Sequence, residues 1–281
     1  MIRMRTALFV AAAATAAPAA IAADLTVPKG TYLELKAATP FDSETAKKGD
    51  TFTATVTRGL WVEGQLAIPA GSTVTGTIKS VRGTRDGSKS AAVGVKFESL
   101  SAGGGTYPLA GVLVSLKADE RKKILEQQGK ISTGRHVDVI LIGLGTEPGN
   151  KVDTLVGISG ADRDDLADDW AKSGLGPATV HVAPGTSLTM QLDKSLTVPA
   201  SSGPRSPGDR NIFISSETVK NLQRALKGRN YYTGAVTGNL DQATRDALAR
   251  FQLDQGQPAT GDADEGTVSA LGVMTAGTAG R

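Results

Sequence analysis

The feature that most constrains the fold of this chain is a change in hydrophobic periodicity near residue 200. Before that point, short segments with apolar residues two apart alternate with Gly- and Pro-containing turns, which is typical of β-strands that bury one face. After it, apolar residues recur about every 3.6 positions, which indicates amphipathic helices. We therefore predict a β-rich domain (residues 24–199), a linker rich in Pro, Ser and Gly (200–214), a small helical domain (215–272) and a disordered tail (273–281).

One turn phrase occurs three times in the predicted β domain, at Val27–Thr31, Ile68–Ser72 and Ala183–Thr186. In each copy a Pro- and Gly-containing turn leads into a strand whose apolar residues fall two apart. The fold class predicted for this region is all-β, barrel-like or sandwich-like, with one or two short helices. Further strands are predicted at Thr51–Val56, Val93–Phe97, Leu109–Leu116 and Val137–Leu144, and short helices at Ala118–Gln128 and Asp162–Trp170.

The first 23 residues have the pattern of a secretory signal peptide. Arg3 and Arg5 precede an uncharged, Ala-rich run, and Ala20-Ile21-Ala22 fits the small-x-small rule for cleavage. The alternative is an N-terminal membrane anchor, but the apolar run is shorter than the roughly 20 residues that a spanning helix needs. We expect a mature protein that is periplasmic or secreted and has no stable membrane insertion.

Composition and charge exclude several classes of protein. The chain has no cysteine, which rules out thiol catalysis and Cys-based zinc sites. The formal net charge is +3, and Arg3 and Arg5 would leave with the signal peptide, so the balance does not indicate a nucleic-acid-binding protein.

No catalytic set is evident in the predicted β domain. The histidines are His136 and His181, and His136 with Asp138 and His181 could form a zinc site, although no Glu lies beside either histidine to serve as a general base. Solvated or capping histidines at strand ends are the simpler interpretation, and neither a Gly-x-Ser-x-Gly nor a Ser-x-x-Lys motif is present. We therefore expect no metal, no cofactor and no enzymatic activity.

The helical region combines a specific order of motifs. Val219, Leu222 and Leu226 lie on one face of a first helix, Asp241 opens a second, and Asp264 precedes a third. Together with Gly234, Gly238, Thr244, Phe251-Gln252, Thr260-Gly261, Thr267 and Leu271, this order resembles the three-helix peptidoglycan-binding domain family found on wall hydrolases. The stretch from about Pro28 to Ile78, with Pro184–Leu192, resembles more weakly the β-barrel part of conjugal-transfer and type IV secretion envelope proteins.

The resemblance to peptidoglycan-binding domains implies a ligand site on the exposed loop after the first helix and on the first turn of the second helix. Leu222, Leu226, Leu248, Phe251 and Leu271 are expected in the core, and Gln223 and Gln252 are expected to satisfy loop backbone groups. Tyr side chains offer a flat apolar face to sugars, and an Arg could pair with a stem-peptide carboxylate. The candidate peptidoglycan-binding residues are Tyr231, Tyr232, Gly234, Thr237, Gly238, Asn239, Thr244 and Arg245.

The resulting hypothesis is an exported, non-enzymatic envelope protein. It would bind peptidoglycan noncovalently through the helical domain and present the β domain to an envelope partner. The alternative is a peptidoglycan hydrolase whose β-rich catalytic domain carries no recognisable motif.

Overall fold

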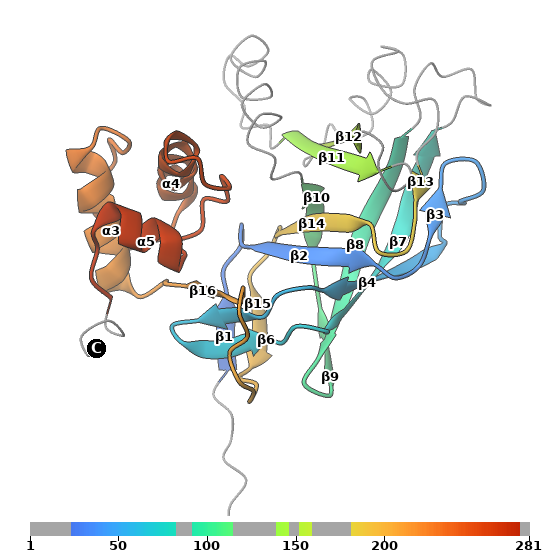
Figure 1. The fold of residues 1–281 in the computed structure, drawn as a ribbon, viewed down its shortest axis with the longest axis horizontal. Coiled ribbons are helices and arrows are strands. Elements are labelled where there is room, and N and C mark those ends of the chain that lie inside the picture. The colour runs from blue at the N-terminus through green and yellow to red at the C-terminus, as the bar shows by residue number, and fades with distance from the viewer. Residues whose placement is uncertain (1–23, 83–91, 115–138, 146–151, 159–180, 276–281) are drawn as a thin grey trace, which may run out of the picture.

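The computed structural model describes residues 24–82, 92–114, 139–145, 152–158 and 181–275. The β domain and the helical domain lie beside one another (Figure 1). The strands are β1 (Asp24–Val27), β2 (Tyr32–Ala37), β3 (Phe41–Asp42), β4 (Thr51–Val56), β5 (Leu60–Val62), β6 (Gln65–Ile68), β7 (Thr73–Arg82), β8 (Ala92–Ala102), β9 (Gly105–Pro108), β10 (Gly111–Val114), β11 (Val139–Gly145), β12 (Val152–Ile158), β13 (His181–Val182), β14 (Ser187–Leu192), β15 (Leu196–Pro199) and β16 (Arg210–Ile212). The helices are α3 (Ser216–Gly228), α4 (Gln242–Asp254) and α5 (Glu265–Leu271).

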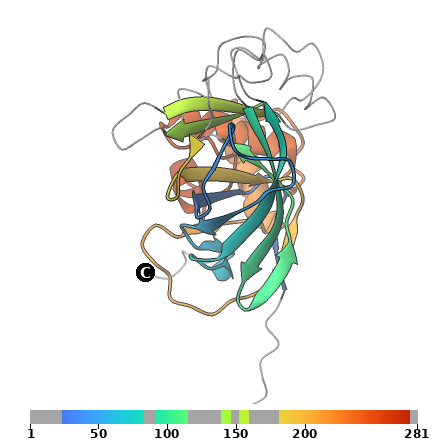
Figure 2. The ribbon, with the colours of Figure 1, turned by 90° about the vertical axis from the view of Figure 1, so that its right-hand side faces the viewer.

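The β domain is built on a seven-stranded antiparallel sheet in the order β10-β14-β2-β4-β7-β8-β9. The sheet curls into a half-barrel (Figure 2), and its edge strands β9 and β10 do not pair with each other. The all-β prediction is confirmed, and the described strands of this sheet form an open half-barrel. Strands β4 and β14 alternate buried and more exposed residues, as the period of two predicts. Phe52 stacks edge-on against Phe97 in the core that this alternation creates.

The three repeated phrases are three equivalent turns. In each, the amide after the glycine donates to the carbonyl three residues earlier, and the glycine has a φ of +86° (Gly30), +85° (Gly71) or +85° (Gly185). Position i+2 of a type II turn requires a positive φ, which glycine adopts without steric cost. Each glycine N–H also donates to a carbonyl of a neighbouring strand, so the same local phrase places three strand starts against the sheet.

The helical domain has its own hydrophobic core, as the helical periodicity predicts. The five expected core residues, Leu222, Leu226, Leu248, Phe251 and Leu271, are each at most 3% exposed. Val273 and Thr275 were predicted in the disordered tail, but Val273 packs against this core and Thr275 is buried. Residues 276–281 of that prediction lie outside the described part.

Some predictions fall on residues outside those that the structure describes. These are the signal peptide, the helices at Ala118–Gln128 and Asp162–Trp170, and His136 with Asp138. His181 begins β13, and its side chain also lies outside the described part. The strand predicted at Val137–Leu144 corresponds to β11, which forms a hairpin with β12.

The segment predicted as a linker is attached to both domains at several points. Its strand β16 pairs in parallel with β5, and β5 pairs with β6 to complete a three-stranded sheet. Asp209 accepts hydrogen bonds from the Gly59 N–H (2.8 Å) and from the Trp61 indole (3.0 Å). Glu63 of the β domain accepts the N–H groups of Ile214 and Ser215, just before α3. On the side of the helical domain, Arg205 pairs with Glu265 of α5 (2.6 Å). These bonds hold the start of the helical domain against the β domain.

Asp262 is the centre of the contact between the domains. Its side chain is fully buried and pairs with Arg245 of the helical domain (2.7 Å) and with Arg210 of β16 (2.5 Å). It also accepts the Tyr32 N–H of β2, and Arg210 donates to the Tyr32 carbonyl (2.7 Å). Burial lowers the pKa of Arg210, but the adjacent Asp262 carboxylate reverses this and raises it. A charged, hydrogen-bonded cluster therefore fixes how the two domains meet.

Candidate functional site

The helical domain contains two copies of one loop-and-helix unit. Val236–Thr244 and Ala259–Thr267 share a Thr-Gly-x-x-Asp-x-x-Thr pattern, and each leads into a helix. In both units the Asp caps the helix by accepting the N–H of the last Thr, at 2.8 Å for Asp241 and 2.9 Å for Asp264. The repeat explains why two short loops take the same shape.

A buried glutamine holds each of these loops in place. Gln223 of α3 accepts the Gly238 N–H (2.9 Å) and donates to the Asn239 carbonyl (3.1 Å). Gln252 of α4 does the same for the second loop, accepting the Gly261 N–H (2.7 Å) and donating to the Asp262 carbonyl (3.0 Å). The expectation that both glutamines satisfy loop backbone groups is confirmed.

Four of the eight candidate binding residues are buried. Tyr232 is 4% exposed and donates its hydroxyl to the Ala235 carbonyl (2.8 Å). Thr244 is fully buried against Gln223, and Gly238 lies beneath the same loop. Arg245 is 4% exposed and already paired with Asp262, so the predicted exposed fork for a ligand carboxylate is not formed. The side chains of Tyr232, Thr244 and Arg245 and the backbone of Gly238 therefore face the interior of the domain.

The other four candidates lie at the surface. Thr237 and Asn239 are exposed, while Tyr231 and Gly234 are partly exposed. The Tyr231 ring meets the Phe251 ring edge-on, with centroids 5.4 Å apart, which joins it to the core. Of the two tyrosines, only Tyr231 can present part of its ring to a ligand.

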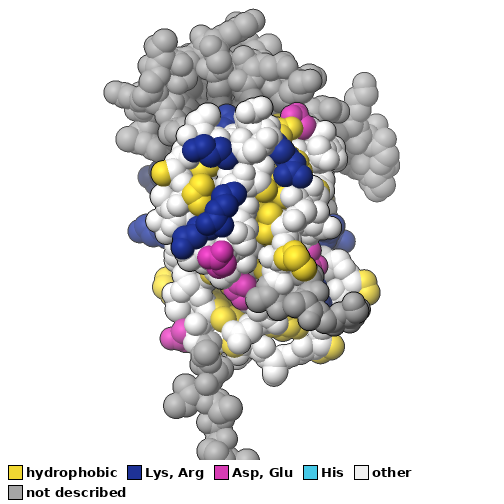
Figure 3. All heavy atoms as spheres, turned by 90° about the vertical axis from the view of Figure 1, so that its left-hand side faces the viewer, with side chains coloured by type: hydrophobic (Ala, Val, Ile, Leu, Met, Phe, Trp, Pro, Cys, Tyr) yellow, Lys and Arg dark blue, Asp and Glu magenta, His cyan; other side chains and the backbone are white. Residues whose placement is uncertain are grey.

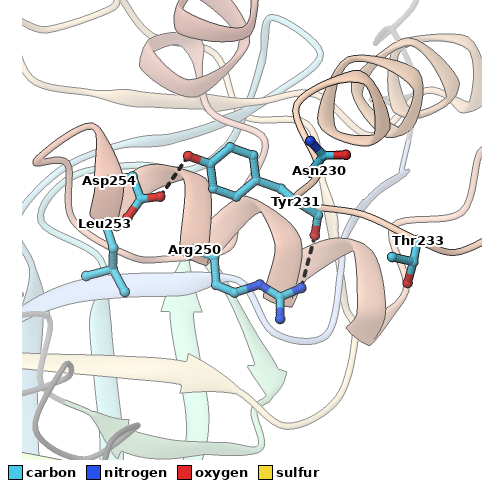
Figure 4. Close-up of a pocket in the computed structure, with 6 residues that line it drawn as sticks. All are labelled: Asn230, Tyr231, Thr233, Arg250, Leu253 and Asp254. Carbon is cyan, nitrogen blue, oxygen red and sulfur yellow. Dashed lines mark hydrogen bonds between the residues drawn. The ribbon is translucent and has the colours of Figure 1, made fainter.

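Tyr231 borders a surface hollow of about 440 Å³ (Figure 4). The hollow lies between the loop after α3 and the last turns of α4, and it is lined by Asn230, Tyr231, Thr233, Arg250, Leu253 and Asp254. Inside it, the Tyr231 hydroxyl donates to Asp254 (2.7 Å) and Arg250 donates to the Tyr231 carbonyl (3.0 Å). The hydrogen bond to the Asp254 carboxylate raises the pKa of the Tyr231 hydroxyl.

The sequence-based site missed Arg250, Leu253 and Asp254. They belong to α4, but to the last turns of that helix instead of the first. A usable signal was present, because Arg250 and Asp254 are four residues apart and therefore share one face of the helix. Arg250 lies directly before the core residue Phe251, so this exposed face of α4 borders the face that packs into the core.

The side of the molecule formed by the helical domain carries scattered Lys and Arg side chains with hydrophobic patches between them (Figure 3). On α3, Lys220, Arg224 and Lys227 follow one another at helical spacing, and the last two are exposed. Arg224 lies 3.9 Å from Glu217, a surface pair that contributes little to stability. None of these three basic side chains lines the hollow beside Tyr231.

A second hollow, of about 500 Å³, lies in the β domain near β3 and β7. Asp50 is the one titratable side chain among its lining residues, so those residues hold no acid–base pair. In the described part of the chain, no three His, Asp or Glu side chains gather as metal ligands. Among the helices of the described residues, none is long and apolar enough to span a membrane.

The C-terminal part is a compact three-helix domain with a polar surface hollow. Residues 215–271 match the family model described as "Putative peptidoglycan binding domain". The resemblance seen in the sequence is thereby confirmed over the whole of this domain.

The similarity of the chain to solved structures is much lower. The structure of ComB10 of the Com type IV secretion system of Helicobacter pylori matches with 12% identity and a TM-score of 0.32. The match covers 67% of this chain and 95% of that chain. A likeness at this level carries no argument about role. None of the curated proteins matches the sequence.

Proposed function

We propose that this protein is an exported, non-enzymatic component of the cell envelope that binds peptidoglycan noncovalently through its helical domain. The observation that carries the proposal is the match of residues 215–271 to the peptidoglycan-binding family, in a domain with the three helices that the resemblance implies. The surface residues Tyr231, Gly234, Thr237 and Asn239, with the hollow beside Tyr231, are the proposed wall-facing site. The signal-peptide pattern of residues 1–23 supports a periplasmic or secreted, wall-associated location.

The β domain is proposed to present a surface to another envelope protein. The contacts of Asp262 and Glu63 support this role, because they give the β domain a set orientation relative to the wall-binding domain. A partner bound to the β domain would then be held at a defined place near the wall.

Sedimentation with purified sacculi tests the proposal. The chain from Asp24 to Arg281 should pellet with sacculi, and a chain ending at Ile212 should stay in the supernatant. Ending at Ile212 keeps β16 paired with β5, and circular dichroism would check that the shortened chain is folded. If the full chain stays soluble, peptidoglycan binding is wrong. If it releases soluble muropeptides from the sacculi, the protein is a hydrolase and the non-enzymatic part of the proposal is wrong.

A further inference from the structure

The hollow beside Tyr231 displays both signs of charge. Arg250 and Asp254 are exposed, one helical turn apart on α4, and both line the hollow. Neither takes part in an ion pair with any residue that the structure describes. A guanidinium and a carboxylate at this spacing commonly pair with each other on a helix surface. Their separation here therefore requires other contacts that hold them apart.

Tyr231 keeps the two charged groups apart. Its hydroxyl holds the Asp254 carboxylate by Oδ2, and its carbonyl oxygen holds Nη2 of Arg250 (Figure 4). The edge-on contact with Phe251 fixes the ring between these two bonds. Arg250 therefore uses one of its nitrogens for positioning, and Asp254 uses one of its oxygens. The remaining guanidinium donors and the Asp254 Oδ1 are left for a ligand.

The character of the hollow fits a peptide better than a sugar. Sugar recognition relies on an open aromatic face, and the one aromatic side chain that lines the hollow, Tyr231, is only partly exposed and has its ring edge-on against Phe251. By contrast, a carboxylate on Arg250 would gain charge-assisted hydrogen bonds, and an ammonium on Asp254 would do the same. A volume of about 440 Å³ suits one or two amino-acid residues.

We propose that this hollow binds the peptide part of peptidoglycan, at a residue that carries a free carboxylate and a free amine. The carboxylate lies on Arg250 and the ammonium on Asp254, while Asn230 and Thr233 are placed to contact the peptide backbone. Diamino-acid residues of stem peptides have this chemistry. The inference rests on the proposed function, since it names the component of the wall that the helical domain recognises.

Isothermal titration of the full chain (24–281) tests the inference with three probes. These are a stem peptide that ends in a diamino acid, the same peptide with its carboxylates amidated, and the wall disaccharide without peptide. We expect binding of the first probe, weakening by at least about tenfold for the amidated peptide, and weaker binding still for the disaccharide. Tighter binding of the disaccharide than of the peptide would overturn the inference.

Variants locate the binding. Arg250→Gln should weaken binding of the unmodified peptide by at least about tenfold, with partial recovery in Arg250→Lys, because lysine keeps the charge without the fork. Arg224→Gln is the matched control: it removes an exposed arginine from α3, away from the hollow, and should bind as the unmodified protein does. Amidation of the peptide should reduce its affinity for the Arg250→Gln variant only slightly, because both changes remove the same contact between the carboxylate and Arg250. Equal loss in Arg250→Gln and Arg224→Gln would refute a specific contact at Arg250.

Sedimentation with sacculi, run in parallel, distinguishes loss of the proposed peptide site from loss of wall binding by the whole domain. If the unmodified chain and Arg250→Gln pellet equally and the peptide does not bind, the hollow is not the site, but wall binding by the domain stands. If the unmodified chain does not pellet, the proposed function fails, and the inference fails with it.

Discussion

Substituting Gly30 by alanine would test whether the two domains are docked as the structure shows. A Cβ at this position would lie 2.9 Å from Nε, 3.0 Å from Cδ and 3.2 Å from Cζ of Arg245. Two matched controls exist in the same protein. Gly71 and Gly185 occupy equivalent turns with a φ of +85°, and a Cβ there would meet nothing within 4 Å. The three substitutions share the backbone strain and differ in the contact with Arg245.

The expected magnitudes follow from this difference. An L side chain at positive φ costs about 1–2 kcal/mol, and this is the whole effect expected for Gly71→Ala and Gly185→Ala. Gly30→Ala must also displace the buried Arg245 side chain, for which overpacking costs about 1–3 kcal/mol more. Arg245 has little room to adapt, because its side chain is buried and its short bond to Asp262 (2.7 Å) holds it.

Thermal unfolding followed by circular dichroism measures the effect. At roughly 2–4 °C per kcal/mol for a domain of this size, Gly30→Ala should have a Tm about 2–12 °C below that of either control. When Arg245 is also replaced by alanine, the additional decrease in Tm of Gly30→Ala should disappear, and the three glycine substitutions should lower the Tm equally. Equal Tm values for Gly30→Ala and the controls in the unmodified background would refute the docking of Arg245 on this turn.

Two further predictions concern single contacts. Asp241→Ala removes the cap of α4 and should lower the free energy of unfolding by about 1 kcal/mol in urea titrations, whereas Asp241→Asn should retain most of the stability; equal losses would contradict the capping role. Burial raises the pKa of Asp209, but the Ser206 N–H, the Trp61 indole and the Gly59 N–H outweigh it and leave the pKa lowered. The folded-state pKa therefore lies below the unfolded one, so this carboxylate stabilises the protein above about pH 4 and loses that effect as the pH falls through the folded pKa. The difference in Tm between the unmodified protein and Asp209→Asn should accordingly shrink from about pH 6 to about pH 3, and a constant difference would count against the linkage.

The sequence predicted well what depends on neighbours along the chain. The spacing of Leu222, Leu226, Leu248 and Phe251 defines the helical core because helix periodicity is local. The three Pro- and Gly-containing turns could likewise be predicted from the sequence, because a positive φ at one position favours glycine whatever surrounds it. These features needed no knowledge of the tertiary structure.

What could not be predicted depends on contacts between distant segments. Arg245 was expected at the surface because arginines mostly are exposed, but its burial depends on Gly30, more than 200 positions earlier in the chain. Residues 200–214 have the composition of a linker, and their attachment relies on polar bonds of Asp209 and on strand pairing of β16, which hydrophobicity does not report. Whether the sheet closes likewise depends on the pairing of β9 and β10, which local alternation leaves open.

The repeat within the helical domain shows how one unit can serve two purposes. Asn239 and Asp262 occupy equivalent positions after the glycine of each loop, and each has its carbonyl held by a buried glutamine. Asp262 is fully buried and joins the β domain through Arg210, whereas Asn239 is exposed. A carboxylate suits the second loop because two arginines neutralise it there, and a neutral amide suits a loop that faces water. Docking thus buries the second copy of the unit, while Thr237 and Asn239 of the first copy stay exposed as part of the proposed wall-facing site.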